Sequence, residues 1–331
     1  MRVSRDAPEF FVNHEIAPNA LEALVFRPVD RMGNFNQNMF NDDFRNMFFG
    51  SSRRDANTFR ITSNSQELQD QLLGAFVSKH NYSGGYSIVE EIVEEVVQSL
   101  IYYGKAVYIL KEQEDEDEGQ YFRAIPANSV FRFMGLVFQY LPRRARRNWD
   151  SDDELLGREV RFLKRKRLLI FDWKSTVRRK VHYQNRILKT LDRYAHDGGV
   201  KHMARPTHEN PNPKNYFDFR VWKKTQDEAL FSATRSTGWR RRASSHPDLS
   251  DFFICHRLIR FRKLQVELAS HVLETLSVQL SEIGGQEDEN FQLKIEFSDE
   301  YQSIAKLEEL ERRLESEEVS FTEVLDYCYR S

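Results

Sequence analysis

Cysteine is nearly absent from this sequence, with Cys255 and Cys328 the only two among 331 residues. Neither has the C-x-x-C spacing, which argues against a zinc site and against a disulfide-stabilised scaffold. Such low use of cysteine fits a reducing compartment. Long apolar runs are also missing, so we expect no membrane-spanning segment. Residues 1–6 lack the apolar centre of a signal peptide.

The sequence also lacks the short motifs of common catalytic and nucleotide-binding sites. We find no G-x-x-x-x-G-K-[ST], G-x-G-x-x-G or H-E-x-x-H motif and no G-x-S-x-G elbow. His196, His202 and His208 could bind a metal, but no companion cysteine or helix would fix them in place. The acidic run 150–154 could hold a divalent ion as in a nuclease, although a solvated loop explains it equally well. We therefore expect no enzyme activity and no cofactor.

Charge is abundant but unevenly placed. The net charge is −2, yet residues 143–180 hold fourteen Lys or Arg against six acids, and residues 282–331 hold fifteen acids against five bases. A chain polarised in this way can meet a polyanion at one end and repel it at the other. For any single cluster, a solvated surface is an equally good explanation. The basic clusters are Arg143, Arg144, Arg146 and Arg147, then Lys164, Arg165, Lys166 and Arg167, then Arg240, Arg241 and Arg242.

The clearest hydrophobic pattern lies near the C-terminal end of the sequence. Apolar residues at steps of three and four from Leu258 to Leu280 predict a long helix over 248–283, which Gly284-Gly285 ends. Alternation over 291–297 predicts a strand. Two helices are predicted to follow, one beginning at about Ser298 and one after Ser320, where Ser320-x-x-Glu323 forms a capping box.

The first half predicts mixed helix and strand. A helix from Ser87 to Tyr103 carries an unbroken apolar stripe opposite its glutamates, with a second capping box at its start. Strands are predicted at 106–110 and 121–125, and a hairpin at 130–140 turns at Gly135. We expect the helix stripe to pack against the strand at 291–297.

The middle and the N-terminal region are less regular. A helix is predicted over 175–195, followed by a loop rich in Pro and Gly. Alternation of Phe217, Phe219 and Val221 predicts a short strand. Residues 1–65 show no clear period, so they are expected to be extended. Together these patterns predict an α+β fold that is mainly helical.

The order of these elements resembles that of the tailed-bacteriophage portal, or head-to-tail connector, proteins. The likeness covers roughly 87–325 and rests on architecture, without a signature motif. It is carried by a capped helix leading into Leu100–Ile109 and Phe122–Pro126, by two helices that bracket an excursion, and by Leu293–Phe297 followed by Ser298–Glu300, an acidic helix and Val319–Val324. The chain is short for a portal, and a counterpart of the large crown is not expected.

This resemblance implies a domain plan. It comprises an N-terminal arm (1–65), a first wing-like α+β part (66–172), a stem-like helix (173–195), a clip-like excursion (196–247), a long stem-like helix (248–283), and a second wing part with short C-terminal helices (284–331). It also implies a ring of about twelve subunits at one capsid vertex, which passes double-stranded DNA without sequence preference. The implied partners are the terminase motor, the capsid protein and a tail adaptor, and the implied location is the virion after assembly in the host cytoplasm.

The same resemblance suggests roles for the basic clusters. The two clusters at 143–147 and 164–167 are candidates for DNA contact, and Arg240–Arg242 are candidates for contact with the motor or adaptor. The residues alone leave two other classes open: a nucleic-acid-binding assembly or regulatory protein that uses the basic middle region, and an enzyme with an unrecognised site.

Overall fold

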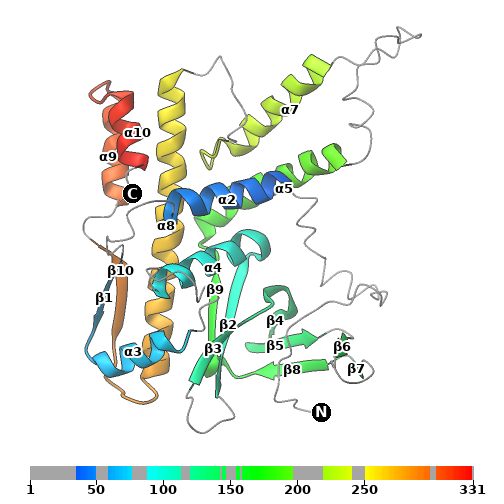
Figure 1. Cartoon of the computed structure of the whole chain (residues 1–331), viewed down its shortest axis with the longest axis vertical. Coiled ribbons are helices and arrows are strands. Elements are labelled where there is room, and N and C mark those ends of the chain that lie inside the picture. The colour runs from blue at the N-terminus through cyan, green and yellow to red at the C-terminus, as the bar shows by residue number, and fades with distance from the viewer. Residues whose placement is uncertain are drawn as a thin grey trace. The chain divides into compact units, whose positions relative to one another are not determined.

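The computed structural model describes ten segments of the chain (Figure 1). They are residues 35–49, 59–76, 88–112, 120–141, 144–146, 154–156, 159–196, 219–240, 250–298 and 303–329. The fold is α+β and mainly helical, as the sequence predicts. Contacts divide the chain into two compact units. Unit 1 holds the described residues of 61–172 and 272–295, and unit 2 those of 30–60, 173–271 and 296–331.

Unit 1 is built in layers around a three-stranded sheet. This sheet has the order β3-β2-β9, from Gln120–Ile125, Lys105–Glu112 and Leu168–Asp172, and all its pairs are antiparallel. Helix α4 (Ile88–Tyr103) covers one face, because its apolar stripe repeats at helical spacing and is buried. The helix and both predicted strands are confirmed, whereas Ser87 of the predicted capping box lies outside the described residues.

The other face of this central sheet packs on a second three-stranded sheet. That sheet has the order β4-β5-β8, from Val130–Phe133, Leu136–Leu141 and Glu159–Leu163. Its inward side chains alternate with outward ones, as the period of two in a strand requires. The buried cluster between the sheets consists of Val107, Ile125, Val130, Val137, Leu163, Leu168 and Ile170.

The predicted hairpin over 130–140 is confirmed as β4 and β5. Met134 and Gly135 form its two-residue turn, with φ of 49° and 78°. Two successive residues with positive φ match the right-handed twist of a hairpin, and glycine suits the second position. The Met134 side chain is 86% exposed at the tip.

The outer face of the β4-β5-β8 sheet is apolar, although no element that the structure describes covers it. The strand register places three phenylalanines side by side on this face, because it pairs Phe131 with Phe138 and Phe138 with Phe162. The Phe131 and Phe138 rings stack at 5.5 Å, and the Phe162 ring meets Phe138 edge-on at 5.8 Å. Exposed members of this outer face are Phe131, Phe133, Leu136, Val160 and Phe162, with exposed fractions of 42, 61, 47, 43 and 48%.

The long helix α8 (Asp251–Gly284) confirms the predicted one and contributes to both units. In unit 1 its Gln279 amide accepts from Ile170 N at 2.7 Å and donates to Ile170 O at 2.9 Å. Ser277 and Ser281 accept from the backbone N–H groups of Ile295 and Leu293, both at 2.8 Å. Strand β10 (Leu293–Phe297), which pairs with β1 (Phe59–Ser63), therefore lies against α8. Its predicted packing on the α4 stripe stays a prediction.

Shorter elements complete unit 1. They are α3 (Gln66–Gly74), the 3-10 turns η1 (Ala127–Ser129) and η2 (Arg165–Arg167), and the paired strands β6 (Arg144–Arg146) and β7 (Glu154–Leu156).

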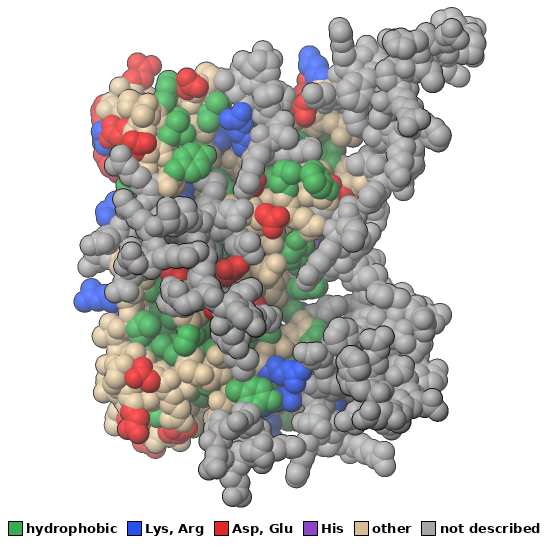
Figure 2. Space-filling view, in the orientation of Figure 1, with side chains coloured by type: hydrophobic (Ala, Val, Ile, Leu, Met, Phe, Trp, Pro, Cys, Tyr) green, Lys and Arg blue, Asp and Glu red, His purple; other side chains and the backbone are tan. Residues whose placement is uncertain are grey.

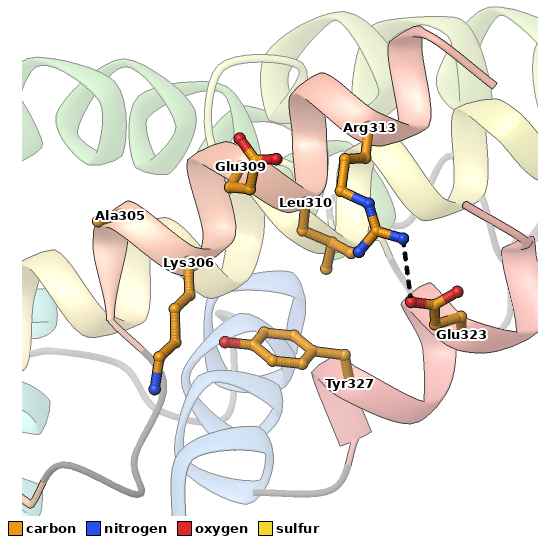
Figure 3. Close-up of a pocket in the computed structure, with 7 residues that line it drawn as sticks. All are labelled: Ala305, Lys306, Glu309, Leu310, Arg313, Glu323 and Tyr327. Atoms are coloured by element: carbon orange, nitrogen blue, oxygen red, sulfur yellow. Dashed lines mark hydrogen bonds and ion pairs between the residues drawn. The ribbon is translucent and has the colours of Figure 1, made fainter. Parts of the chain in front are cut away.

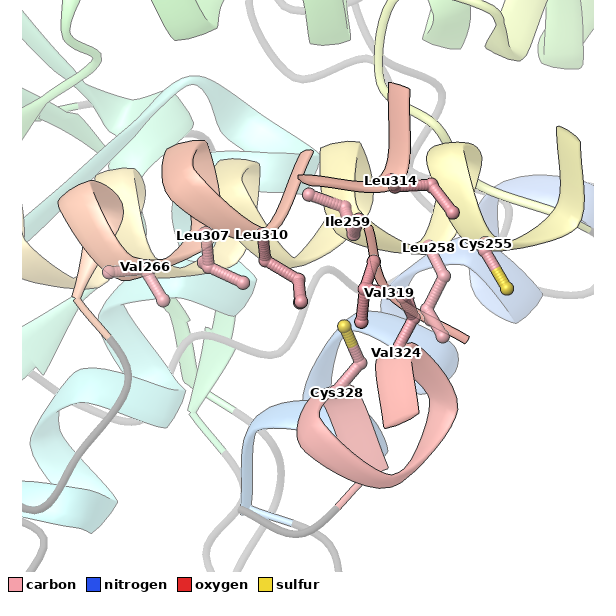
Figure 4. Packing of buried hydrophobic residues seen from close by; sticks show 10 residues of the cluster. All are labelled: Cys255, Leu258, Ile259, Val266, Leu307, Leu310, Leu314, Val319, Val324 and Cys328. Atoms are coloured by element: carbon pink, nitrogen blue, oxygen red, sulfur yellow. The ribbon is translucent and has the colours of Figure 1, made fainter. Parts of the chain in front are cut away.

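In unit 2, helices α9 (Ile304–Glu315) and α10 (Phe321–Tyr329) pack on the first half of α8. Apolar side chains from all three helices point toward one another (Figure 4). Both cysteines lie in this cluster as free thiols, and burial raises the pKa of Cys328 to about 12. Ser320 accepts from Glu323 N at 3.2 Å, so the predicted N-cap of α10 is confirmed. Acidic side chains gather on the outer surface of α9 and α10, at the upper left of Figure 2.

The predicted extended arm is wrong for residues 35–49, which form helix α2 (Phe35–Phe49). Phe40 and Phe44 are buried and contact Phe261 of α8, and Phe40 also meets Trp239 edge-on at 5.4 Å. The helix escaped prediction because its apolar face is made of only a few aromatic residues spaced among asparagines. Residues 1–34 lie outside the described part of the chain.

One predicted element of the middle region is wrong, and another is confirmed. The predicted strand is wrong, because Phe219 and Val221 lie in helix α7 (Phe219–Thr234), whose later residues are good helix formers; Phe217 is outside the described residues. Helix α5 (Ser175–His196) confirms the predicted one and packs on α7, with Thr237 Oγ1 donating to Gln184 Oε1. The predicted excursion over 196–247 thus contains a packed helix.

The C-terminal residues are shared between the two units. Residues 272–295 belong to unit 1, whereas α9 and α10 bury their apolar faces on α8 within unit 2. The predicted division into wing, stem and clip stays a prediction.

Candidate functional site

The first predicted DNA-contact cluster is only partly within the described residues. Arg143 and Arg147 lie outside them. Arg144 and Arg146 lie in β6, whose backbone pairs with β7 in the register Arg144–Leu156 and Arg146–Glu154. A role in DNA binding stays a prediction for all four.

The second cluster is an exposed basic turn. Lys164, Arg165, Lys166 and Arg167 form a 3-10 turn before β9, closed by Arg167 N donating to Lys164 O at 3.0 Å. All four residues are exposed. Arg165 Nη1 donates to Leu168 O at 2.9 Å, which holds one guanidinium along the turn. The turn therefore presents several cations on a backbone that the adjoining β9 fixes.

The predicted motor-contact cluster begins at a well-packed point. Gly238 has φ of 76°, and a Cβ there would come within 2.3 Å of Arg257 O, so only glycine fits. Trp239 is buried and donates from Nε1 to Asp43 Oδ2 at 3.0 Å. Arg240 follows and is half-buried, while Arg241 and Arg242 lie outside the described residues. Contact with a motor or adaptor stays a prediction.

A buried arginine supports this turn from α8. Arg257 Nη2 donates to Thr234 Oγ1 at 2.6 Å and to Trp239 O at 2.5 Å, and its guanidinium lies 4.6 Å from the Phe231 ring centre. Burial, with the charges of Arg240 and Arg260 added, lowers the pKa of Arg257 to about 10. These hydrogen bonds fix the backbone at Trp239, directly before Arg240.

Histidine and acidic side chains meet between α8 and α9. His256 Nε2 lies 3.2 Å from Glu311 and 3.6 Å from Glu315, and together they are candidate metal ligands. Lys263 also bonds Glu311, and Arg260 lies 3.7 Å from it. Although burial opposes ionisation, the hydrogen bond and charge of Lys263, with His256 and Arg260, hold the pKa of Glu311 below its ordinary value. A metal would compete with these cations, so the group fits an ion-pair cluster that ties the helices together.

A pocket of about 440 Å³ opens between α9 and α10. Figure 3 shows the Tyr327 ring lying between the two helices, with Leu310 on the α9 side. Arg313 Nη2 donates to Glu323 Oε1 at 3.4 Å across its rim, and Lys306 and Glu309 add charge. The lining therefore combines an aromatic ring and an apolar side chain with charged groups of both signs.

One charged surface, on helix α5, was not predicted from the sequence. The exposed face of this helix is basic, and its signal in the sequence is basic residues at steps of three and four. It consists of Arg178, Arg179, His182, Arg186 and Lys189, here called the α5 basic face.

In the described part of the chain, no helix combines the length and apolar character needed to cross a membrane. No protein-family model matches the sequence, and no curated protein matches it. Among solved structures, the chain is similar to one titled "Neck of empty GTA particle computed with C6 symmetry". The TM-score is 0.42 at 10% identity, over 90% of this chain and 89% of that chain. With a TM-score below 0.5, the likeness does not define the function, which has to be inferred from the residues of this chain.

Proposed function

We propose that this chain is a structural subunit of a portal-like ring at one capsid vertex of a tailed phage. The observation that carries the proposal is the order of the described elements. Helix α4 leads into β2 and β3, helix α5 and the long helix α8 flank the middle region, and α8 leads into β10, α9 and α10. This is the order on which the resemblance to portal proteins rests.

The apolar outer face of the β4-β5-β8 sheet supports assembly. Contiguous exposed apolar surface is a feature of interaction sites, and three phenylalanines are exposed on this small sheet. A face that one subunit leaves bare can be buried by repeating the same contact around a closed ring. The proposed role is therefore structural, without catalysis by the subunit itself.

In this proposal, double-stranded DNA passes through the ring without sequence preference. Contacts to phosphate carry no sequence information, and they let a protein slide along a duplex. The acidic surface of α9 and α10 would repel the duplex, whereas the exposed turn at 164–167 would attract it. The terminase motor, capsid protein and tail adaptor would dock on the same ring in the virion.

The proposal is tested by the size and shape of the purified full chain. We expect light scattering to report about twelve subunits and negative-stain microscopy to show closed rings with a central channel. A mass of one or two subunits at micromolar protein, across a range of salt concentrations, would contradict it.

A nucleic-acid-binding regulatory protein is the second candidate, favoured by the exposed basic turn Lys164–Arg167. Such a protein would protect a defined DNA sequence in a footprint, whereas a portal-like ring would not. Replacing the four residues of the turn with alanine separates the two further. A ring should keep its assembly and lose only salt-dependent DNA affinity.

A further inference from the structure

Helix α5 exposes a row of basic side chains on the side away from its core. Residues 178, 182, 186 and 189 follow one another at steps of four, four and three, which places them along one line of the helix. Arg179 lies beside that line. All five residues of the α5 basic face are exposed, whereas Val177, Val181 and Leu188 on the opposite side are buried.

Nothing on the described part of α5 neutralises these charges. Asp192 is the helix's only acid, and it is buried. It accepts from Asn36 N at 3.0 Å and from Asn36 Nδ2 at 2.7 Å, at the start of α2. Glu267, near the beginning of α5, is engaged by Lys174 at 3.6 Å and by Thr176 Oγ1 at 2.9 Å. None of the five residues of the α5 basic face makes an ion pair with a residue that the structure describes.

The dimensions of the row match a nucleic-acid backbone. The eleven helical steps from Arg178 to Lys189 span about 16 Å. Each strand of a duplex carries one phosphate per about 3.4 Å of axis, so the row can face roughly five phosphates of one strand. Tyr183, 46% exposed, lies one position from His182 and can add a hydroxyl donor.

The acidic surface of a second copy fits this face less well. Helix α9 carries cations among its acids, and several acids are already used within the chain. Glu309 pairs with Arg312 at 2.6 Å, and Glu323 pairs with Arg313 at 3.4 Å. A row of one sign complements a backbone of one sign better than it complements a mixed surface.

We infer that the α5 basic face binds the phosphate backbone of a nucleic acid, without reading its sequence. The inference rests on the proposed function only in naming duplex DNA as the polyanion. The guanidinium and ammonium groups neutralise phosphates and release their counterions, so affinity falls steeply as salt rises. Phosphate contacts of this kind hold a duplex near the helix and still allow it to slide.

The test compares two triple variants of the full chain, each removing three positive charges from exposed side chains of unit 2. One replaces Arg178, Arg186 and Lys189 with glutamine. The control replaces Lys180, Lys224 and Arg235, which lie off the row, with glutamine. Affinity for a short labelled duplex of arbitrary sequence is measured by fluorescence anisotropy across a sodium chloride series. Thermal melting and ring formation are recorded for every variant.

The row variant should lose affinity on the order of tenfold or more at low salt, and the slope of log K against log salt should fall by about 2.7 for three lost phosphate contacts. The control variant should keep most of the DNA affinity and most of the salt slope. Equal losses in the two variants, or no loss in the row variant, would overturn the inference.

Other outcomes are equally decisive. If the row variant stops assembling but its subunits bind DNA normally, the occupant is a second copy and the inference fails. A wild-type chain that binds DNA through this row but forms no ring would refute the proposed function and leave the inference standing. A wild-type ring that does not bind duplex DNA would refute the inference alone.

Discussion

The two sheets of unit 1 have the same number of strands and opposite surroundings. The β3-β2-β9 sheet is covered on both faces, by α4 and by the second sheet. Its strand β9 accordingly has a continuous apolar run from Leu168 to Phe171, and all four residues are buried. Among the described elements, the β4-β5-β8 sheet is covered on one face only, yet its outer face carries phenylalanines where a solvated sheet would carry polar residues.

This difference separates two uses of hydrophobic side chains. Those of the central sheet are needed for the subunit to fold, because their burial is complete within the chain. Those on the outer face contribute less to the stability of one subunit, because 42–61% of their surface stays in water. We therefore expect mutations in the first sheet to change unfolding and mutations on the second to change assembly.

The largest effect is expected at Leu169, which is 0% exposed in β9. Leu169→Ala should lower the free energy of unfolding by about 2–5 kcal/mol, because it removes apolar contacts and leaves a cavity. Chemical denaturation of the isolated subunit measures this loss. A cost below about 0.5 kcal/mol would mean that the central sheet is not the core.

A smaller loss is expected from the helix that covers the central sheet. Val96 is 0% exposed on α4, and Val96→Ala should cost about 1–3 kcal/mol. The same denaturation experiment applies, with Glu91→Ala on the other side of α4 as the control. If the two substitutions cost the same, α4 does not cover the sheet through its apolar stripe.

The hairpin tip offers a change in the opposite direction. Met134 holds a positive φ that asparagine adopts at less cost, and Asn-Gly is the preferred pair for this turn. Met134→Asn should therefore stabilise the subunit by about 1 kcal/mol, as an increase in the denaturation midpoint. Gly135→Ala should have the reverse effect, since it places a side chain at φ of 78° in otherwise open space.

The smallest effect on stability is expected on the outer face. Phe133→Ser should change the free energy of unfolding by less than about 0.5 kcal/mol, because the ring is already 61% exposed. It should, however, shift the protein toward smaller species in light scattering. The control is Phe253→Ser on α8, where the ring is 51% exposed and lies outside this sheet. Equal effects of both substitutions on assembly would remove the distinction between the two sheets.

The elements in which apolar residues recur at a regular spacing could be predicted from the sequence. Helices α4, α5 and α8, the hairpin at Met134-Gly135 and the cap at Ser320 all combine a clear period with a turn or capping signal. These signals act over a few residues, so they do not depend on what each element packs against.

The errors arose where distant partners decide the structure. Helix α2 has few apolar residues, and Trp239 and Phe261, about 200 residues further along the chain, complete its core. Alternation of Phe219 and Val221 was too short to outweigh the helix formers after them. Lys164–Arg167 could be identified from the sequence because they are contiguous, whereas the basic residues of α5 are spread along the helix and come together only on its exposed face.

Helix α8 closes two strand edges with side chains. Ser277, Gln279 and Ser281 bond backbone groups of Ile295, Ile170 and Leu293, as a neighbouring strand would. An open strand edge is a template for pairing with another molecule, and such pairing leads to fibres and aggregates. Because α8 occupies these backbone groups in β9 and β10, neither strand can extend its sheet into another chain there. The subunit can therefore expose an apolar sheet face without also polymerising through the edges of β9 and β10.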